Sequence, residues 1–186
     1  MISHEMVVLC SEDGTPVGTA LKSEVHTTET PLHLAFSCYV FNQKGEFLVT
    51  RRALSKKTWP GIWTNSACGH LAPGESAREA VERRVPYEIG VPQGALDNIV
   101  CALADFSYRA VDSRGIVEWE ICPVFVATLK PGVEINPRDD EVEQLAWTTA
   151  DELISAVEAA PYAFSDWMRE QLSHSELKDI LRERSA

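Results

Sequence analysis

The chain has 186 residues, of which 45% are hydrophobic and 24% are charged, as in an ordinary globular protein of one domain. Its formal net charge of −11 argues against a nucleic-acid or anionic-membrane binder, because such proteins need a basic surface. It has no apolar run near the roughly 20 residues of a membrane span, no secretion signal, and an odd, scattered set of five cysteines, so we expect a cytoplasmic protein without disulfides.

The N-terminal part of the chain is predicted to form two β-hairpins. The short apolar segment 6–10, the turn residues Asp13 and Gly14, and a partner strand over 17–22 make the first hairpin. Segments 33–41 and 47–52 are rich in β-branched and aromatic residues and make the second. The chain between the two hairpins is expected to be loop.

The middle of the chain combines an irregular segment with an amphipathic helix. Residues 53–67 are expected to be irregular, and small or apolar residues recur at helical spacing over 76–89. Gly90 is a natural left-handed stop for that helix. Pro86 removes one backbone hydrogen bond, so we expect a bend or a loosened turn there.

The C-terminal half is predicted to begin with strands and to end with helices. In chain order we expect a linker at 92–98, strands at 99–109 and 117–128 joined by a turn at 112–115, a loop at 130–140, a strand at 142–147, and helices at 149–158, 164–172 and 176–184. Strands first, one helix between them and helices last indicate an α+β fold.

Three of the five histidines, His26, His33 and His70, are candidate metal ligands. Glu118 and Glu120 are two residues apart in a predicted strand, so both side chains leave the same face. Three imidazoles and one or two carboxylates suit Zn²⁺, Mn²⁺ or Fe²⁺. Surface or structural histidines, and a strand edge that faces solvent, fit the same pattern.

Cys68 is the cysteine with a candidate chemical role. It lies between Ala67 and Gly69, two residues before His70 and just ahead of a helix, so it could be a nucleophile or an acid and base. A buried, inert thiol is the alternative. The other four cysteines lie in apolar strand contexts, and we assign them to the core.

Local positive charge on this acidic chain favours a small anionic ligand such as a diphosphate. Arg52, Lys56 and Arg84 could bind it through guanidinium and ammonium groups. Glu88 follows Arg84 by four helical residues, which fits either an ordinary ion pair or a Mg²⁺ carboxylate beside the phosphates.

The helical segment resembles the Nudix box, although the match is partial. The matching positions are Gly69, Glu75, Arg83, Glu88 and Gly90. Arg84 and Tyr87 stand where the box has glutamates that hold metals for pyrophosphate hydrolysis. The resemblance implies a Nudix fold, and the two replacements argue against hydrolysis.

Longer segments resemble the type 1 isopentenyl-diphosphate delta-isomerase family, and the similarity extends from the first hairpin to Met168. They are 32–37, 48–57, 59–70, 115–125 and 163–168. The resemblance implies an α+β fold of Nudix type, an α/β/α sandwich with a mixed β-sheet, an extra N-terminal β-hairpin and C-terminal helices. It divides the chain into an N-terminal hairpin and loop carrying a metal ligand (1–30), a Nudix-like catalytic domain (31–168) and a C-terminal helical tail (169–186).

The resemblance also implies the roles of individual residues. It implies a catalytic pair, Cys68 and Glu120, with Tyr108 hydrogen-bonded to Glu120. The implied metal site, for Mn²⁺ or Zn²⁺ (or Mg²⁺), consists of His26, His33, His70, Glu118 and Glu120. The implied ligands of a Mg²⁺ that also contacts the diphosphate are Glu88 and the Cys68 backbone carbonyl. The implied substrate-binding residues are Lys22, Arg52, Lys56, Arg84, Trp63 and Tyr162, where the family often has tryptophan at the last position.

The reaction implied by the resemblance moves a carbon–carbon double bond by one position in a small diphosphate substrate. A proton is added at one end of the allylic system and another is removed from the far side, which requires an acid, a base and a dry, electron-rich pocket. We expect a monomer or a homodimer. The alternatives are a Nudix hydrolase of a nucleoside diphosphate derivative and a non-catalytic module that binds diphosphates.

Overall fold

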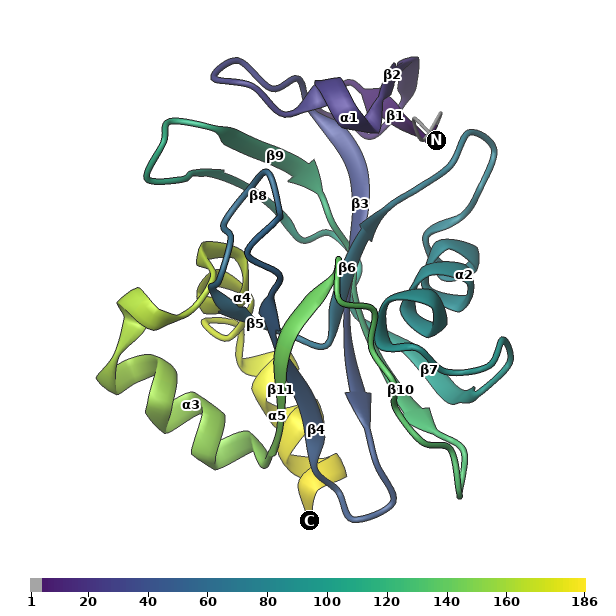
Figure 1. The fold of residues 1–186 in the computed structure, drawn as a ribbon, viewed down its shortest axis with the longest axis vertical. Helices are drawn as coiled ribbons and strands as arrows, with labels where there is room; N and C mark the ends of the chain where they lie inside the picture. Colours follow the sequence, from purple (N-terminus) through teal and green to yellow (C-terminus); the bar gives the residue numbers. More distant parts are fainter. Residues whose placement is uncertain (1–4) are drawn as a thin grey trace.

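Strand β3 (His33–Phe41) is the centre of the β-structure in the computed structural model, which describes residues 5–186 (Figure 1). Its partners are β1 (Met6–Cys10), β4 (Phe47–Arg52), β6 (Ala67–His70), β9 (Val117–Ile121) and β10 (Val124–Leu129). The pairs with β9 and β10 are parallel and the other three are antiparallel. The sheet is therefore mixed, as expected for the predicted α+β fold.

The remaining strands pair with these partners. They are β2 (Pro16–Leu21) on β1, β5 (Trp63–Thr64) and β11 (Val142–Thr148) on β4, β7 (Leu96–Leu103) on β10, and β8 (Ser107–Val111) on β9. Both predicted N-terminal hairpins are present, and β3 and β4 have the predicted bounds. The expected irregular segment at 53–67 contains β5, and Cys68 lies in β6 rather than in a loop.

The predicted hairpin of strands 99–109 and 117–128 is divided into two pairs. β7 pairs with β10, whereas β8 pairs with β9. Residues 104–106 separate β7 from β8, and residues 122–123 separate β9 from β10. The prediction of two continuous strands was wrong, and the interruption at 122–123 follows from Pro123, which has no N–H to donate to a strand ladder. Its carbonyl accepts a hydrogen bond from the Ser37 N–H at 3.1 Å, between the segments of β9 and β10 that pair with β3.

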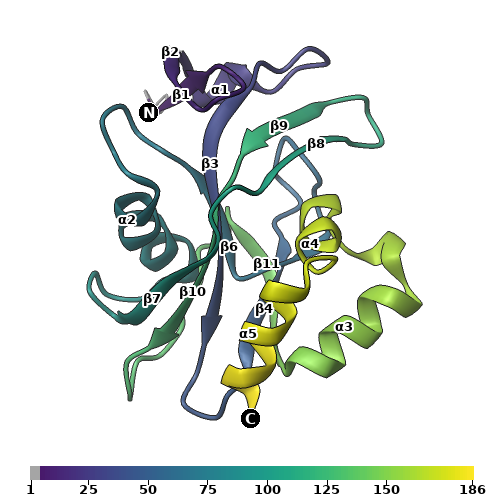
Figure 2. The ribbon, with the colours of Figure 1, turned by 180° about the vertical axis from the view of Figure 1, so that it is seen from behind.

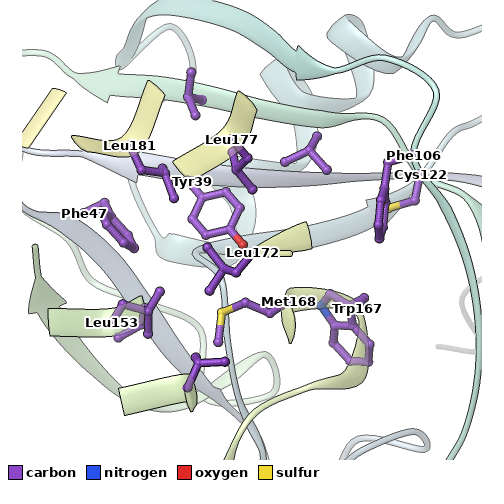
Figure 3. Packing of buried hydrophobic residues seen from close by; sticks show 14 of the residues in the cluster. Tyr39, Phe47, Phe106, Cys122, Leu153, Trp167, Met168, Leu172, Leu177 and Leu181 are labelled. Carbon is purple, nitrogen blue, oxygen red and sulfur yellow. The ribbon is translucent and has the colours of Figure 1, made fainter. Parts of the chain in front are cut away.

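Two hydrophobic cores lie on opposite faces of β3, because side chains alternate along a strand. The first core contains Ala35, Tyr39 and Phe41, and the second contains Phe36, Cys38 and Val40. Helix α2 covers the second core, and α3, α4 and α5 cover the first (Figures 1 and 2). Figure 3 shows the first core, where Tyr39 and Phe47 of the sheet lie among leucines of α3 and α5.

The helices agree closely with the predicted ones. They are α1 (Lys22–Val25), α2 (Ala77–Ile89), α3 (Ala150–Ala159), the 3-10 turn η1 (Pro161–Ala163), α4 (Asp166–Gln171) and α5 (Ser175–Ser185). The expected loop between the hairpins contains α1, and the predicted helix 164–172 begins later, at Asp166. None of the helices in residues 5–186 has both the length and the apolar character needed to cross a membrane.

Both ends of α2 are fixed by its sequence. Ser76 and Glu79 form a capping box at its start. Gly90 ends it in the left-handed conformation with φ 68°, and a Cβ atom there would lie 1.5 Å from the Asn136 carbonyl oxygen. Pro86 lies inside the helix, which continues through it to Ile89.

Three of the four cysteines that were predicted to belong to the core are buried. Cys10, Cys38 and Cys122 are buried, in agreement with the assignment to the core. The assignment was wrong for Cys101, which is exposed on β7, a strand that among residues 5–186 pairs only with β10.

Candidate active site

Most of the predicted site residues line one cavity of about 460 Å³. Those present are Lys22, His26, Arg52, Lys56, Cys68, His70, Arg84, Glu88, Tyr108, Glu118 and Glu120. They come from strands and helices far apart in the sequence, so the fold brings together the predicted acid–base, metal and diphosphate groups.

The register of β3 and its neighbours positions the central part of this site. His33 of β3 lies opposite Glu120 of β9, and Tyr108 of β8 lies on the other side of Glu120. Further along β3, Ser37 lies opposite Cys68 of β6. Cross-strand partners have closely spaced Cβ atoms, so one continuous strand holds the imidazole, the carboxylate and the thiol in a common frame.

Four of the predicted metal ligands form a compact cluster. Donor atoms of His26, His33, His70 and Glu120 all lie within 4.8 Å of one another. The three imidazole centroids are 5.1 to 5.3 Å apart. Within residues 5–186, buried nitrogen atoms without a hydrogen-bond partner occur on these three histidines: His26 Nε2, His33 Nε2 and His70 Nδ1.

The hydrogen bonding of His33 fits metal binding. Its Nδ1 lies 2.9 Å from the Pro31 carbonyl, which can only accept, so Nδ1 carries a proton. Nε2 faces Glu120 Oε1, 3.2 Å away, and in the neutral form of the ring it presents a lone pair there. Two facing lone pairs are favourable only with a cation between them, and a backbone acceptor on the second ring nitrogen is common for metal-binding histidines. The donor set of three imidazoles and a carboxylate fits a divalent metal.

Burial and the neighbouring charges perturb the pKa values of this cluster. Burial lowers the pKa of both His26 and His70 to about 4, so both are neutral at physiological pH. Burial also opposes protonation of His33, but the Glu120 carboxylate raises its pKa above the ordinary value. Burial opposes ionisation of Glu120, but His33 and His70 outweigh it and lower the Glu120 pKa well below its usual range. Metal ligands must be deprotonated to bind, which the neutral His26 and His70 and the ionised Glu120 satisfy.

Glu118 is buried beside this cluster but has other partners. Its carboxylate accepts hydrogen bonds from the Thr58 and Tyr108 hydroxyls. Tyr108 also lies 2.9 Å from Glu120 Oε2, the contact that the sequence analysis expected. Burial, with the two carboxylates, raises the Tyr108 pKa well above its ordinary value, so the phenol stays protonated.

The Cys68 thiol is half-buried at the cavity and has two polar contacts. Its Sγ lies 3.1 Å from Asn65 Oδ1 and 3.2 Å from Ser37 Oγ. Burial raises the pKa of the thiol to about 12, although both contacts work in the opposite direction. Cys68 is therefore a neutral thiol at physiological pH, able to give a proton.

Two of the cations that line the cavity, Arg84 and Lys56, are paired with carboxylates. Arg84 donates to Glu88 Oε1 at 2.7 Å, so the expected (i, i+4) pair is formed, and it also donates to Glu141 at 3.1 Å. Lys56 forms an ion pair with Glu141 as well. Burial, reinforced by Glu141, raises the pKa of Glu88. Glu141 was not among the predicted site residues, because it lies between the predicted loop 130–140 and the predicted strand 142–147, where no motif singles it out.

The aromatic residues of the cavity differ from the expected ones. Trp63 is half-buried and Tyr162 is 84% exposed, and neither lines the cavity. Their role in substrate binding stays a prediction. Trp167 lines it instead, with the Arg52 guanidinium 5.4 Å from its ring centroid. Trp167 lies in the family-like segment 163–168, and its position in the sequence alone does not indicate a role.

Comparison with solved structures establishes the class of protein. The NUDIX domain model matches residues 31–169. A crystal structure of a Deinococcus radiodurans protein superposes with a TM-score of 0.69 at 19% identity, covering 91% of this chain and 98% of that one. The Escherichia coli dihydroneopterin triphosphate pyrophosphohydrolase gives a TM-score of 0.55 at 16% identity over 81% of this chain and 95% of that one. The chain is thus a Nudix-fold protein.

Sequence relatives specify the family within that class. The isopentenyl-diphosphate delta-isomerase of Corynebacterium diphtheriae is 64% identical over 95% of this chain and 96% of its own length. The protein of the same name from Corynebacterium efficiens is 54% identical over 97% of this chain and 95% of its own length. The one from Kocuria rhizophila is 52% identical over 95% of this chain and 96% of its own length. The chain belongs to the isopentenyl-diphosphate delta-isomerase family, as its resemblance implied.

Proposed function

We propose that this protein interconverts isopentenyl diphosphate and dimethylallyl diphosphate, in the cytoplasm. The observation that carries the proposal is the joint presence of a neutral thiol, an ionised carboxylate and four cations around one cavity. A 1,3 shift of a double bond needs an acid and a base at the hydrocarbon end and positive charge at the diphosphate end. Family membership supports the same substrate pair.

In this proposal Cys68 and Glu120 exchange protons with the two ends of the allylic system. Tyr108 donates to Glu120 and fixes the orientation of its carboxylate. The thiol carries a proton and the carboxylate does not, so the pair contains one acid and one base before substrate enters. The buried surroundings exclude water, which would otherwise capture a carbocation-like intermediate.

We assign the diphosphate to Lys22, Arg52, Lys56 and Arg84 at the same cavity. A Mg²⁺ held by Glu88 and the Cys68 carbonyl would add positive charge beside the phosphates. We assign the Mn²⁺ or Zn²⁺ site to His26, His33, His70 and Glu120, with Glu118 as an additional ligand. A metal there would keep Glu120 ionised and fixed in place.

Hydrolysis of a nucleoside diphosphate derivative is the second candidate, because the fold is that of Nudix hydrolases. The positions of two box glutamates carry Arg84 and Tyr87, and Arg84 forms an ion pair with Glu88. This replacement supplies a phosphate-binding cation in place of a metal ligand. It favours the isomerase.

Incubation of the metal-loaded protein with isopentenyl diphosphate in D₂O tests the proposal. We expect dimethylallyl diphosphate that contains deuterium, because the added proton comes from a group that exchanges with solvent. Cys68→Ala and Glu120→Gln should abolish the conversion while leaving the circular dichroism spectrum unchanged. Release of phosphate or nucleoside monophosphate from a substrate panel, without isomerisation, would support the hydrolase instead.

A further inference from the structure

The side chain of Asn65, between β5 and β6, is fully buried and its orientation is fixed by backbone groups. Its Nδ2 donates to the Cys38 carbonyl at 3.1 Å and to the Ala67 carbonyl at 3.0 Å. Carbonyl oxygens only accept hydrogen bonds, so the nitrogen of the amide must face them. The carbonyl oxygen Oδ1 therefore points to the opposite side, toward Cys68.

Asn65 Oδ1 is surrounded by hydrogen-bond donors. It accepts from Thr64 Oγ1 at 2.8 Å, from Trp167 Nε1 at 3.2 Å and from Cys68 Sγ at 3.1 Å. An amide oxygen has no proton to give, so the Cys68 contact forms only when the sulfur itself carries and donates the hydrogen. Asn65 Oδ1 thus gives the Cys68 S–H bond a buried acceptor.

A second chain of hydrogen bonds reaches the Cys68 sulfur from the first core. The Tyr39 hydroxyl donates to Gln171 Oε1 at 2.9 Å, which fixes the Gln171 amide, and Gln171 Nε2 donates to Ser37 Oγ at 2.9 Å. The Ser37 hydroxyl hydrogen is then free to point to Cys68 Sγ at 3.2 Å or to Cys122 Sγ at 3.4 Å. Figure 3 shows the Tyr39 hydroxyl, Trp167 and Cys122 in this buried region.

We propose that Asn65 is a positioning residue for the reaction: its Oδ1 holds the Cys68 sulfur in place by accepting the S–H, while the Ser37–Gln171–Tyr39 chain places a second polar group 3.2 Å from the sulfur. The inference rests on the proposed function in one respect, the participation of the thiol in proton transfer. A thiol rotates freely about its Cβ–Sγ bond unless a partner fixes it. Proton transfer to carbon depends strongly on this alignment.

A purely structural role for Asn65 is the competing explanation, because its amide also links β3 to β6. Ser66 provides a matched control. Its buried hydroxyl donates to the Leu48 carbonyl at 2.6 Å and accepts from the Val40 N–H at 2.7 Å, within the same connection, without contacting Cys68. If Asn65 only stabilises the fold, Asn65→Ala and Ser66→Ala should have the same consequences.

The test compares the parent with Asn65→Ala and Ser66→Ala in the metal-loaded enzyme. We expect kcat to fall by about 10²-fold in Asn65→Ala, the effect of a small misplacement of a reacting group, with KM and inorganic pyrophosphate binding unchanged. Ser66→Ala should lose stability but retain kcat. Equal kcat values in the two variants would overturn the proposal.

An infrared measurement tests the orientation independently of activity, and so remains informative if the proposed function fails. The S–H stretching band of Cys68 is isolated as the difference between each protein and its Cys68→Ala counterpart. It should move to higher frequency in Asn65→Ala, because the thiol loses its acceptor, and stay in place in Ser66→Ala.

Trp167→Phe is a milder variant in case Asn65→Ala does not fold. It removes one competing donor to Oδ1 and keeps an aromatic ring, so the Cys68 band should move to lower frequency, the opposite direction. An unchanged band in both variants would contradict the assigned contact.

Discussion

The Tyr108 hydroxyl lies 2.9 Å from Glu120 Oε2, and the same oxygen lies 2.8 Å from Glu118 Oε2. A phenol has one proton, so Tyr108 donates to one carboxylate at a time. Both glutamates are buried, and the phenol between them limits how far either can rotate. Tyr108 therefore links the predicted base to the second carboxylate of β9.

Tyr108→Phe should lower kcat about 10²-fold, because Glu120 loses the donor that fixes its orientation. Inorganic pyrophosphate should bind with unchanged affinity, since the phenol does not belong to the cationic end of the cavity. Steady-state kinetics and calorimetry measure the two quantities. A loss of pyrophosphate affinity equal to the loss of kcat would show instead that the cavity as a whole had been disturbed.

The histidine cluster should make thermal stability depend on metal. A divalent ion at 100 times its Kd stabilises the folded state by about 2.7 kcal/mol, so Zn²⁺ or Mn²⁺ should raise the Tm of the chelator-treated protein. His26→Ala should abolish this increase and lower the bound metal measured by mass spectrometry. His174→Ala changes an exposed histidine outside the cluster and should retain it. Equal metal content in all three proteins would argue against the cluster as the binding site.

Glu141 forms ion pairs with two of the cations assigned to the diphosphate, Lys56 and Arg84. Glu141→Gln should therefore tighten pyrophosphate binding in the absence of Mg²⁺ by about tenfold, or about 1.4 kcal/mol. Isothermal titration in a chelating buffer measures the change. Glu143→Gln, at an exposed position of β11 two residues further along the chain, is the control and should have no effect. Weaker binding by the Glu141 variant would mean that the carboxylate organises the cations rather than neutralising them.

The ion pair of Glu75 and Arg83, joined by two hydrogen bonds, should make part of the free energy of unfolding depend on pH. Arg83 Nε and Nη2 donate to the two Glu75 oxygens at 2.6 and 2.7 Å. Burial opposes ionisation of Glu75, but the hydrogen bonds from Arg83 and from the Ala72 N–H outweigh it and lower its pKa below 4.5. A depressed folded-state pKa gives stability that is present above pH 4.5 and is lost as pH falls through the folded value.

In urea denaturation at pH 7, Glu75→Gln should accordingly have a free energy of unfolding about 1.5–3 kcal/mol below that of the parent, the range for hydrogen bonds to charged groups. This difference should shrink toward pH 3. The exposed pair of Arg78 and Glu82 provides a comparison on the same helix. Glu82→Gln should cost only about 0.3–0.5 kcal/mol. A deficit for Glu75→Gln that does not change with pH would mean that packing, and not charge, accounts for it.

The sequence was sufficient for the elements whose patterns are local. The strands His33–Phe41 and Phe47–Arg52 have the predicted bounds, because their β-branched and aromatic residues end at turn signals. The end of α2 at Gly90 also follows from a local rule. In contrast, the break at Pro123 depends on which strands pair on each side of it, and an apolar run does not carry that information.

The sequence predicted which residues belong to the site better than it predicted which of them contact one another. Nothing in the sequence indicates that Glu141 meets Lys56 and Arg84, because that contact needs strands β4 and β11 side by side. Likewise, the polar character of Asn65 fits a loop, and only the register of β6 against β3 shows that its amide contacts Cys68. Tyr162 stands where the family often has tryptophan, and its ring is outside the cavity lining.

The pairing of β3 with both β9 and β6 has a consequence for insertions and deletions. His33 and Ser37 are four residues apart, and their cross-strand partners are Glu120 and Cys68. One added residue between them would shift the thiol about 3.3 Å along the strand relative to the carboxylate and turn the following side chains to the opposite face. The four-residue spacing on β3 is therefore a length that cannot change without separating the thiol from the carboxylate.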